Sequence, residues 1–198
     1  MAARIRRLSA IEILIVCTGN ICRSPMAEAF LRDRIGYRGV DVRSGGFAFD
    51  GAQSPSDSVD AMAEYRFDLS THRSRRIGAD DVRAADLVIG MEFDHGRKLA
   101  VLAPDRIDRF YTLPEIVDRG STNPAENGEP LAAWLARLHA TRPAHPHLGA
   151  RREYEVTDPF QRPPRVHRQV ADQIEQLSDR LSELLDGPID VASRGSIS

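Results

Sequence analysis

The run Ile11-Glu12-Ile13-Leu14-Ile15-Val16 is followed at once by Cys17-Thr18-Gly19-Asn20-Ile21-Cys22-Arg23-Ser24-Pro25. A short apolar, β-branched run that ends in a polar loop predicts a strand and a tight loop, and Pro25 then opens a helical pattern. The backbone N–H groups of such a loop and those at the start of the helix converge on one small bowl. The pattern therefore predicts an anion-binding site directly after the first strand.

Two side chains add chemistry to this site. Cys17 stands at the mouth of the loop, where a helix N-terminus and nearby cations help a thiol to lose its proton. Arg23 offers a planar fork that suits two oxygens of a phosphate. Without a function, Cys17 would be a small buried residue at a strand end. The glycine, asparagine, arginine and serine around it would then lack a common purpose, so we favour a nucleophile in an oxyanion cradle.

The string from Cys17 to Pro25 resembles the signature of the low-molecular-weight protein tyrosine phosphatase family, and the match is close over residues 16–29. The resemblance implies a phosphatase that hydrolyses phosphotyrosine through a cysteinyl-phosphate intermediate and needs no metal or other cofactor. Its substrate would be a phosphotyrosine-bearing protein or a small aryl phosphate. It also implies that the phosphate oxygens are held by the loop residues Thr18, Gly19, Asn20, Ile21, Cys22 and Arg23.

The same resemblance implies that residues outside the loop support it through hydrogen bonds. The family's hydrogen-bond network, carried onto this chain, would join Asn20 and Ser24 of the loop to Ser44 and His72. A loop of convergent N–H donors has to be braced from outside. His72 on its own would more often be a surface or helix-capping residue, so its role depends on the resemblance.

Asp158 is the expected proton donor. An Asp-Pro pair is normally just a turn, but Asp158-Pro159-Phe160 matches the family's Asp-Pro-aromatic loop, which supplies the general acid. General acid catalysis, which gives the leaving phenolate a proton, typically speeds such a reaction by about 10²–10⁴-fold. Phe47 and Phe49 lie in the segment that forms one wall of the family's active-site cleft. Core packing is an equally good interpretation of these two residues.

Strands and helices alternate along the chain, which predicts an α/β fold: a single three-layer domain with a four-stranded parallel sheet flanked by helices. Further strands are expected at 40–44, 86–91 and 107–111, and ligand belongs beyond the carboxyl ends of the strands. Helices are expected after the loop to about residue 35, and then at 54–66, 92–102, 131–139 and 166–185. The domain should cover residues 8–187, with a family-atypical insertion at 113–152. Gly187 and Pro188 should end the last helix and leave a flexible tail at 188–198.

Composition narrows the function classes. The chain has 198 residues, is 41% hydrophobic and carries a net charge of −2, which fits one domain and gives no sign of a nucleic-acid or membrane-surface partner. The apolar run after the basic start is too short for a signal peptide, and two cysteines five apart suit a reducing compartment, so a cytoplasmic location is expected. His139, His145 and His147 lack an acidic or cysteine partner at ligand spacing, so we expect no metal. The oligomeric state is left open.

Three other functions are compatible with parts of this sequence. Arginine-phosphate phosphatases resemble this family, but often carry a threonine where this chain has Ile21, which favours tyrosine. Thioredoxin-coupled arsenate reductases share the loop, but they relay oxidation through further cysteines that this chain lacks. A catalytically silent phosphate-binding module would not need Cys17, Arg23 and Asp158 together.

Cys22 has two interpretations. It is either a small buried residue of the loop or a redox partner that protects Cys17 from irreversible oxidation. A loop that curls around one phosphate should bring the two cysteines within disulfide reach.

Overall fold

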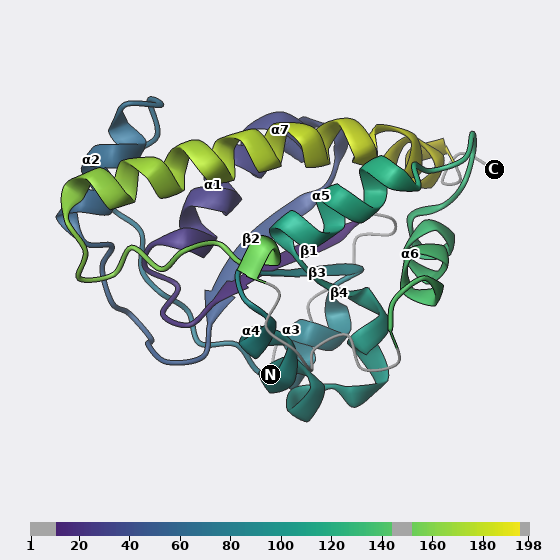
Figure 1. Cartoon of the computed structure of the whole chain (residues 1–198), viewed down its shortest axis with the longest axis horizontal. Coiled ribbons are helices and arrows are strands. Elements are labelled where there is room, and N and C mark those ends of the chain that lie inside the picture. Colours follow the sequence, from purple (N-terminus) through teal and green to yellow (C-terminus); the bar gives the residue numbers. More distant parts are fainter. Residues whose placement is uncertain (1–10, 144–151, 195–198) are drawn as a thin grey trace.

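The computed structural model describes residues 11–143 and 152–194, with side chains to residue 188 (Figure 1). Its sheet consists of β1 (Glu12–Cys17), β2 (Asp41–Gly46), β3 (Leu87–Gly90) and β4 (Phe110–Thr112). The strand order is β2-β1-β3-β4, and every neighbouring pair is parallel. The four-stranded parallel sheet that the alternating pattern predicts is therefore confirmed.

Helices cover both faces of this sheet, because parallel strands need crossover connections. The short 3₁₀ segments are η1 (Gly36–Arg38), η2 (Pro104–Arg109) and η3 (Arg152–Tyr154). The α-helices are α1 (Arg23–Ile35), α2 (Ser56–Ala63), α3 (Ala79–Ala84), α4 (Phe93–Leu102), α5 (Leu113–Thr122), α6 (Leu131–Ala140) and α7 (Pro164–Arg194). In Figure 1, α1, α5 and α7 lie above the sheet, and α3 and α4 lie below it.

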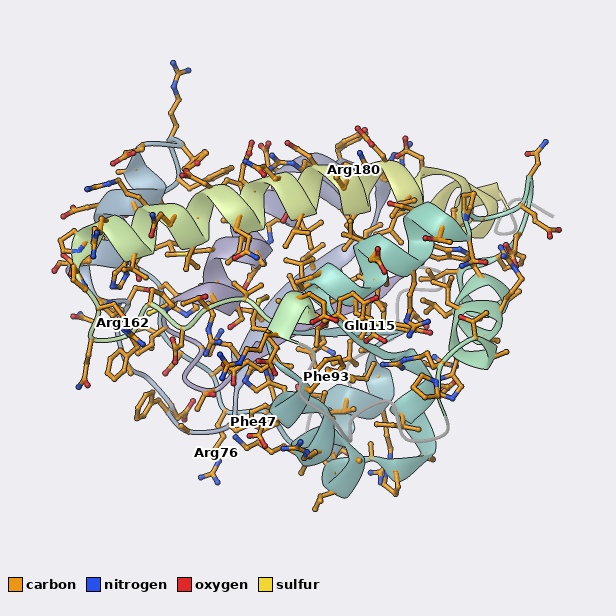
Figure 2. All side chains as sticks on the ribbon, viewed as in Figure 1. Phe47, Arg76, Phe93, Glu115, Arg162 and Arg180 are labelled. Carbon is orange, nitrogen blue, oxygen red and sulfur yellow. The ribbon has the colours of Figure 1, made fainter. Side chains whose placement is uncertain are left out.

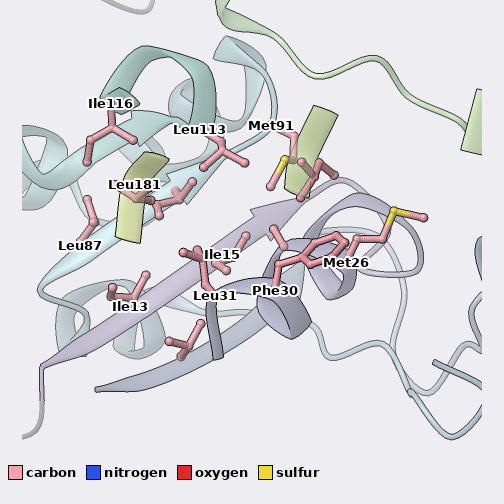
Figure 3. Close-up of a cluster of buried hydrophobic side chains, with 14 of the residues drawn as sticks. Ile13, Ile15, Met26, Phe30, Leu31, Leu87, Met91, Leu113, Ile116 and Leu181 are labelled. Carbon is pink, nitrogen blue, oxygen red and sulfur yellow. The ribbon is translucent and has the colours of Figure 1, made fainter. Parts of the chain in front are cut away.

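Alternation along β1 explains these layers, because successive side chains of a strand point to opposite faces. Ile13 and Ile15 belong to the larger core, which includes residues of α1, α5, α6 and α7 (Figure 3). Leu14 and Val16 belong to a second core formed with residues of α3, α4 and the neighbouring strands. β1 is thus the central, fully covered strand of the fold.

The strand register brings the candidate loop to the carboxyl edge of the sheet. Cys17 pairs with Gly46 of β2, and Val16 pairs with Gly90 of β3. The loop after β1 passes so close to β2 that a Cβ atom on Gly46 would lie 2.8 Å from the backbone nitrogen of Asn20. Real Cβ atoms do not approach backbone so closely, so this position requires glycine.

Several predicted boundaries differ from the structure. The first helix begins at Arg23, two residues before Pro25, because a proline in the first turn lacks only an N–H that has no partner there. β2 extends to Gly46 rather than 44, because its last residues still pair with β1. β4 covers only 110–112, since the preceding residues form η2 and only this short piece pairs with β3.

The end of the last helix was predicted wrongly. α7 runs on to Arg194 with Pro188 inside it. A proline in a helix removes one backbone hydrogen bond and can bend the helix without ending it. Residues 195–198 of the expected tail lie outside the described residues.

The segment 113–143 folds as α5 and α6 and takes part in the main core. Trp134 and Leu138 of α6 are fully buried in it, and the Trp134 indole N–H donates to the carbonyl of Asn123. Within the described ranges, none of the helices combines the length and the apolar character that a membrane crossing requires.

Candidate active site

Cys17 lies at the end of β1 with its sulfur at the base of the loop. The Cys17 Sγ atom is 3.0 Å from Ser24 Oγ, and it accepts a hydrogen bond of 3.2 Å from the backbone N–H of Asn20. The side chain is almost completely buried. The Asn20 N–H donates to the sulfur, and the Ser24 hydroxyl lies within hydrogen-bonding distance of it.

Asn20 connects the loop to its surroundings. Its side-chain amide donates to Ser24 Oγ at 2.9 Å and to Ser44 Oγ at 2.7 Å, and its Oδ1 atom accepts from the backbone N–H of Arg75 at 2.8 Å. Its carbonyl oxygen lies 2.7 Å from His72 Nε2. The structure thus brings Asn20, Ser24, Ser44 and His72 into one network. Asn20 has a positive φ of 51°, a conformation that asparagine tolerates better than most residues.

Hydrogen bonds that the carbonyl groups of the loop accept also orient its N–H groups. The Thr18 carbonyl accepts from the backbone N–H groups of Phe47 at 2.9 Å and Ala48 at 3.0 Å. The C=O and N–H groups of a trans peptide point to opposite sides, so the N–H of Gly19 points away from Phe47. By the same reasoning, the bond from His72 to the Asn20 carbonyl directs the N–H of Ile21 away from His72. These outer contacts leave the N–H groups available to an anion.

Arg23 is buried and has oxygen partners on two sides. Its Nη1 atom contacts the Glu92 carboxylate and donates to the Val156 carbonyl at 3.0 Å, while Nη2 lies 3.1 Å from Asp158 Oδ2. Its Nε atom is buried and has no hydrogen-bond partner among the residues that the structure describes. An unpaired buried donor of a charged group is costly, and a bound anion would supply the missing acceptor.

Asp158 reaches the loop from the segment that precedes α7. The backbone N–H of Phe160 donates to Asp158 Oδ1 at 3.2 Å, which fixes the carboxylate in a turn. The backbone N–H of Val156 donates to the Met91 carbonyl at 2.8 Å and ties this segment to the exit of β3. The Asp158 side chain remains half exposed, so a substrate can reach it.

Three phenylalanines belong to the segments that contact the loop or Asp158. Phe49 and Phe160 are 42% and 43% exposed, and the Phe49 ring would lie 3.1 Å from a Cβ atom on Gly19. Phe49 therefore lies against the loop at Gly19. Phe47 instead stacks on the ring of His95 at a centroid distance of 5.8 Å, and Figure 2 shows it beside α4.

Glu92 and His95, which follow β3, also contact the loop, and the sequence did not predict them as site residues. His95 is fully buried, and its Nδ1 atom accepts from the backbone N–H groups of Met91 at 3.1 Å and Glu92 at 3.2 Å. Its Nε2 atom is 3.2 Å from the hydroxyl of Thr18. The sequence did offer one indication of their role. A glutamate and a histidine closely follow a predicted buried strand, whose carboxyl end lies at the same edge of the sheet as the loop.

Burial lowers the pKa of His95 to about 3, and the nearby cations Arg23 and Lys98 act in the same direction. Burial likewise raises the pKa of the Cys22 thiol to about 11. Both groups are therefore neutral at neutral pH. Cys17 and Cys22 are free cysteines.

Of the three histidines considered for metal binding, only His139 belongs to the described residues. No group of three or more metal-binding side chains occurs among the described residues, and His145 and His147 lie outside them.

The depressed pKa of His95 predicts a loss of stability in mild acid. Below a pH of about 6.5 the unfolded chain binds a proton at this residue and the folded chain does not, so the free energy of unfolding falls as the pH falls toward 3. From about pH 6 to about pH 4, the wild-type protein should lose about 2 kcal/mol more than the His95→Asn variant. Urea unfolding of both proteins at several pH values measures this difference. If both proteins lost the same free energy of unfolding between these pH values, the lowered pKa of His95 would be contradicted.

Comparison with known proteins agrees with this geometry. The family model described as low molecular weight phosphotyrosine protein phosphatase matches residues 12–143. The probable low molecular weight protein-tyrosine-phosphatase EpsP of Ralstonia solanacearum is 37% identical over 105 residues, which are 52% of this chain and 71% of that protein. The protein-arginine-phosphatase of Geobacillus stearothermophilus is 29% identical over 175 residues, which are 88% of this chain and 95% of that protein.

A solved structure is similar over most of the chain. The low molecular weight protein tyrosine phosphatase from T. tengcongensis superposes with a TM-score of 0.65 at 30% identity, over 88% of this chain and 99% of that chain. Together with the family model, which matches two thirds of the sequence, this settles the family. The chain belongs to the low molecular weight phosphotyrosine protein phosphatase family.

Proposed function

We propose that this protein is a cysteine-dependent phosphatase that hydrolyses phosphotyrosine, with Cys17 as nucleophile, Arg23 as phosphate ligand and Asp158 as general acid. The observation that carries the proposal is the contact of Arg23 with Asp158 directly beside a loop in which the Cys17 sulfur accepts from the Asn20 N–H and lies 3.0 Å from Ser24 Oγ. The catalytic domain would cover residues 8–187, with 113–152 as an insertion that is atypical of the family. The proposed location is the cytoplasm.

In the first step, the Cys17 thiolate attacks phosphorus in line with the departing oxygen. The S–P bond forms while the P–O bond to the tyrosine breaks. The N–H groups of residues 18–23 and the guanidinium of Arg23 hold the three remaining oxygens, where charge is spread in the transition state. Asp158 gives its proton to the phenolate oxygen, so the product leaves as a neutral phenol.

In the second step, a water molecule attacks the cysteinyl-phosphate. Asp158, now a carboxylate, takes a proton from the water as the O–P bond forms and the S–P bond breaks. Ser24 Oγ lies 3.0 Å from Cys17 Sγ, and its hydroxyl donates to the departing thiolate. The products are inorganic phosphate and the free enzyme, and neither step in this scheme uses a metal or another cofactor.

Hydrolysis of phosphoarginine is the second candidate. The arginine phosphatase from G. stearothermophilus matches 88% of this chain, a longer stretch than the match with the R. solanacearum protein. Against it stands Ile21, whose buried apolar side chain lies in the loop where phosphoarginine phosphatases often have threonine. Arsenate reduction is less well supported, because Cys17 and Cys22 are the only two cysteines of the sequence and no relay follows them. The Asp158 contact with Arg23 in turn disfavours a silent binding module.

A panel of phosphopeptides tests the substrate class. We expect the protein to release phosphate from a phosphotyrosine peptide much faster than from phosphoarginine or phosphoserine peptides of the same sequence. Cys17→Ser should remove all turnover and still bind phosphate or vanadate, because the N–H groups of the loop and Arg23 remain. A preference for phosphoarginine would establish the second candidate. Phosphate binding without turnover in the wild-type protein would establish the binding module.

Leaving-group dependence tests Asp158. Asp158→Asn should slow the hydrolysis of phenyl phosphate by about 10²–10⁴-fold and that of nitrophenyl phosphate much less, because only a basic leaving group needs a proton. Steady-state rates for a series of substituted phenyl phosphates measure this trend. The same loss for every leaving group would mean that Asp158 shapes the turn and does not donate the proton.

Cys22 should protect Cys17 during oxidation. Peroxide converts the Cys17 thiolate to a sulfenic acid, and the Cys22 thiolate then attacks that sulfur and expels hydroxide to form a disulfide. Dithiothreitol should restore activity to the wild-type protein and not to Cys22→Ser, which proceeds to the irreversible sulfinic acid. Because the pKa of Cys22 is raised to about 11, disulfide formation should speed up by about tenfold per pH unit between about pH 7 and 9.

Mass spectrometry of peptides after peroxide treatment identifies the products. Equal recovery of both proteins, or the absence of a disulfide between Cys17 and Cys22, would show that Cys22 serves packing alone.

A further inference from the structure

The buried ring of His95 contacts Thr18 at the start of the proposed phosphate loop and the backbone of Met91 and Glu92 after β3. Its Nδ1 atom accepts from the N–H groups of Met91 and Glu92, and its Nε2 atom faces the hydroxyl of Thr18. Thr18 follows the proposed nucleophile directly, and Glu92 contacts Arg23 at the other end of the loop. We propose that His95 is a positioning residue, which uses a neutral ring to hold Thr18 and so fixes the start of the phosphate loop. This inference rests on the proposed phosphatase function.

The tautomer of His95 follows from its partners. Two backbone N–H groups converge on Nδ1, and a backbone N–H can only donate, so Nδ1 carries the lone pair. The proton of the neutral ring is then on Nε2, and Nε2 donates to Thr18 Oγ1. A doubly protonated ring would direct a second N–H at the donors of Met91 and Glu92, so the arrangement requires the neutral ring.

The ring is held in place by its surroundings. His95 is fully buried, and Phe47 stacks on it with an interplanar angle of 27°. Phe47 also donates its backbone N–H to the Thr18 carbonyl at 2.9 Å. Thr18 is therefore held through its carbonyl by Phe47 and through its hydroxyl by a histidine that packs on the same phenylalanine.

This contact complements the network around Asn20. Ser44, His72 and Arg75 hold the middle of the loop through Asn20, and these partners come from β2 and the segment after α2. His95 comes from α4, beyond β3, and acts on the first residue of the loop. The loop is thus fixed from two neighbouring strands, one on each side of β1. A loop held at both places presents the N–H of Gly19 to the anion without rearrangement.

Two substitutions separate the two contacts of the ring. In His95→Asn, the amide oxygen is placed like Nδ1 and can still accept from Met91 and Glu92, but the side chain is too short to reach Thr18. In His95→Gln, the amide nitrogen is placed like Nε2 and can still donate to Thr18. Thr18→Val keeps the shape of the threonine and removes the hydroxyl. His139→Asn, on α6, is a matched control for the change of residue type.

The test is a double-mutant cycle on kcat/KM for an aryl phosphate, with thermal unfolding to confirm that each variant is folded. His95→Asn and Thr18→Val should each lower kcat/KM by about five- to tenfold, the effect of one lost hydrogen bond. The double variant should lose no more than either single variant, because both remove the same contact. His95→Gln should retain more activity than His95→Asn, and His139→Asn should match the wild-type protein. Independent losses that multiply in the double variant would overturn the proposal.

Two further readouts do not depend on turnover. Inorganic phosphate, measured by calorimetry, should bind more weakly by the same factor to both single variants and to the double variant. The ¹⁵N spectrum of the wild-type histidine ring should show a neutral ring protonated at Nε2. A ring protonated at Nδ1, or at both nitrogens, near neutral pH would overturn the positioning role. Absence of phosphatase activity in a wild-type protein with the expected ring and phosphate binding would instead count against the proposed function alone.

Discussion

The side-chain amide of Asn20 makes the hydrogen bonds on which the rest of the site depends. A loop that turns its N–H groups toward a bound anion cannot use them for hydrogen bonds that fix its own shape, so other contacts must support it from outside. Asn20 provides this support with three side-chain bonds, to Ser24, Ser44 and the backbone of Arg75. Because Asn20 also sits at a positive φ, its backbone can turn at the same place and direct its own N–H to the Cys17 sulfur. One residue therefore shapes the loop and also contacts the Cys17 sulfur.

The fold makes this support possible through close approach. β2 ends in two glycines, and a side chain on Gly45 would meet Ile77 at 2.2 Å, as one on Gly46 would meet the loop. The backbone of β2 thus lies directly against the loop and brings Ser44 within reach of Asn20. On the other side, the exit of β3 carries Glu92 and His95 toward Arg23 and Thr18. The catalytic loop occupies the position where the ends of three parallel strands meet, as expected for α/β sheets.

The part of the site that is local in sequence could be predicted from the sequence. The strand, the loop and the first helix were visible in one continuous run, and Asp158 was recognisable from its proline and aromatic neighbours. Ser44 and His72 could be named only through the family resemblance, because their side chains meet Asn20 across long stretches of chain. Glu92 and His95 were missed because their role depends on the register that sets Val16 beside Gly90, which no local pattern reveals. The continuation of α7 beyond Pro188 was not predicted for a different reason. Many helices end near a proline, but a helix can also continue through one with a single backbone hydrogen bond lost.

The central claim is that the phosphoryl group of the substrate is transferred to the sulfur of Cys17 before water releases it. Rapid acid quenching of the wild-type protein during turnover of an aryl phosphate, followed by mass spectrometry of its peptides, tests this claim most directly. The account predicts one phosphoryl group on the peptide that contains Cys17, attached to that sulfur, and its accumulation before steady state. A phosphoryl group on another residue such as His95, or turnover with no phosphorylated protein at any time, would contradict it.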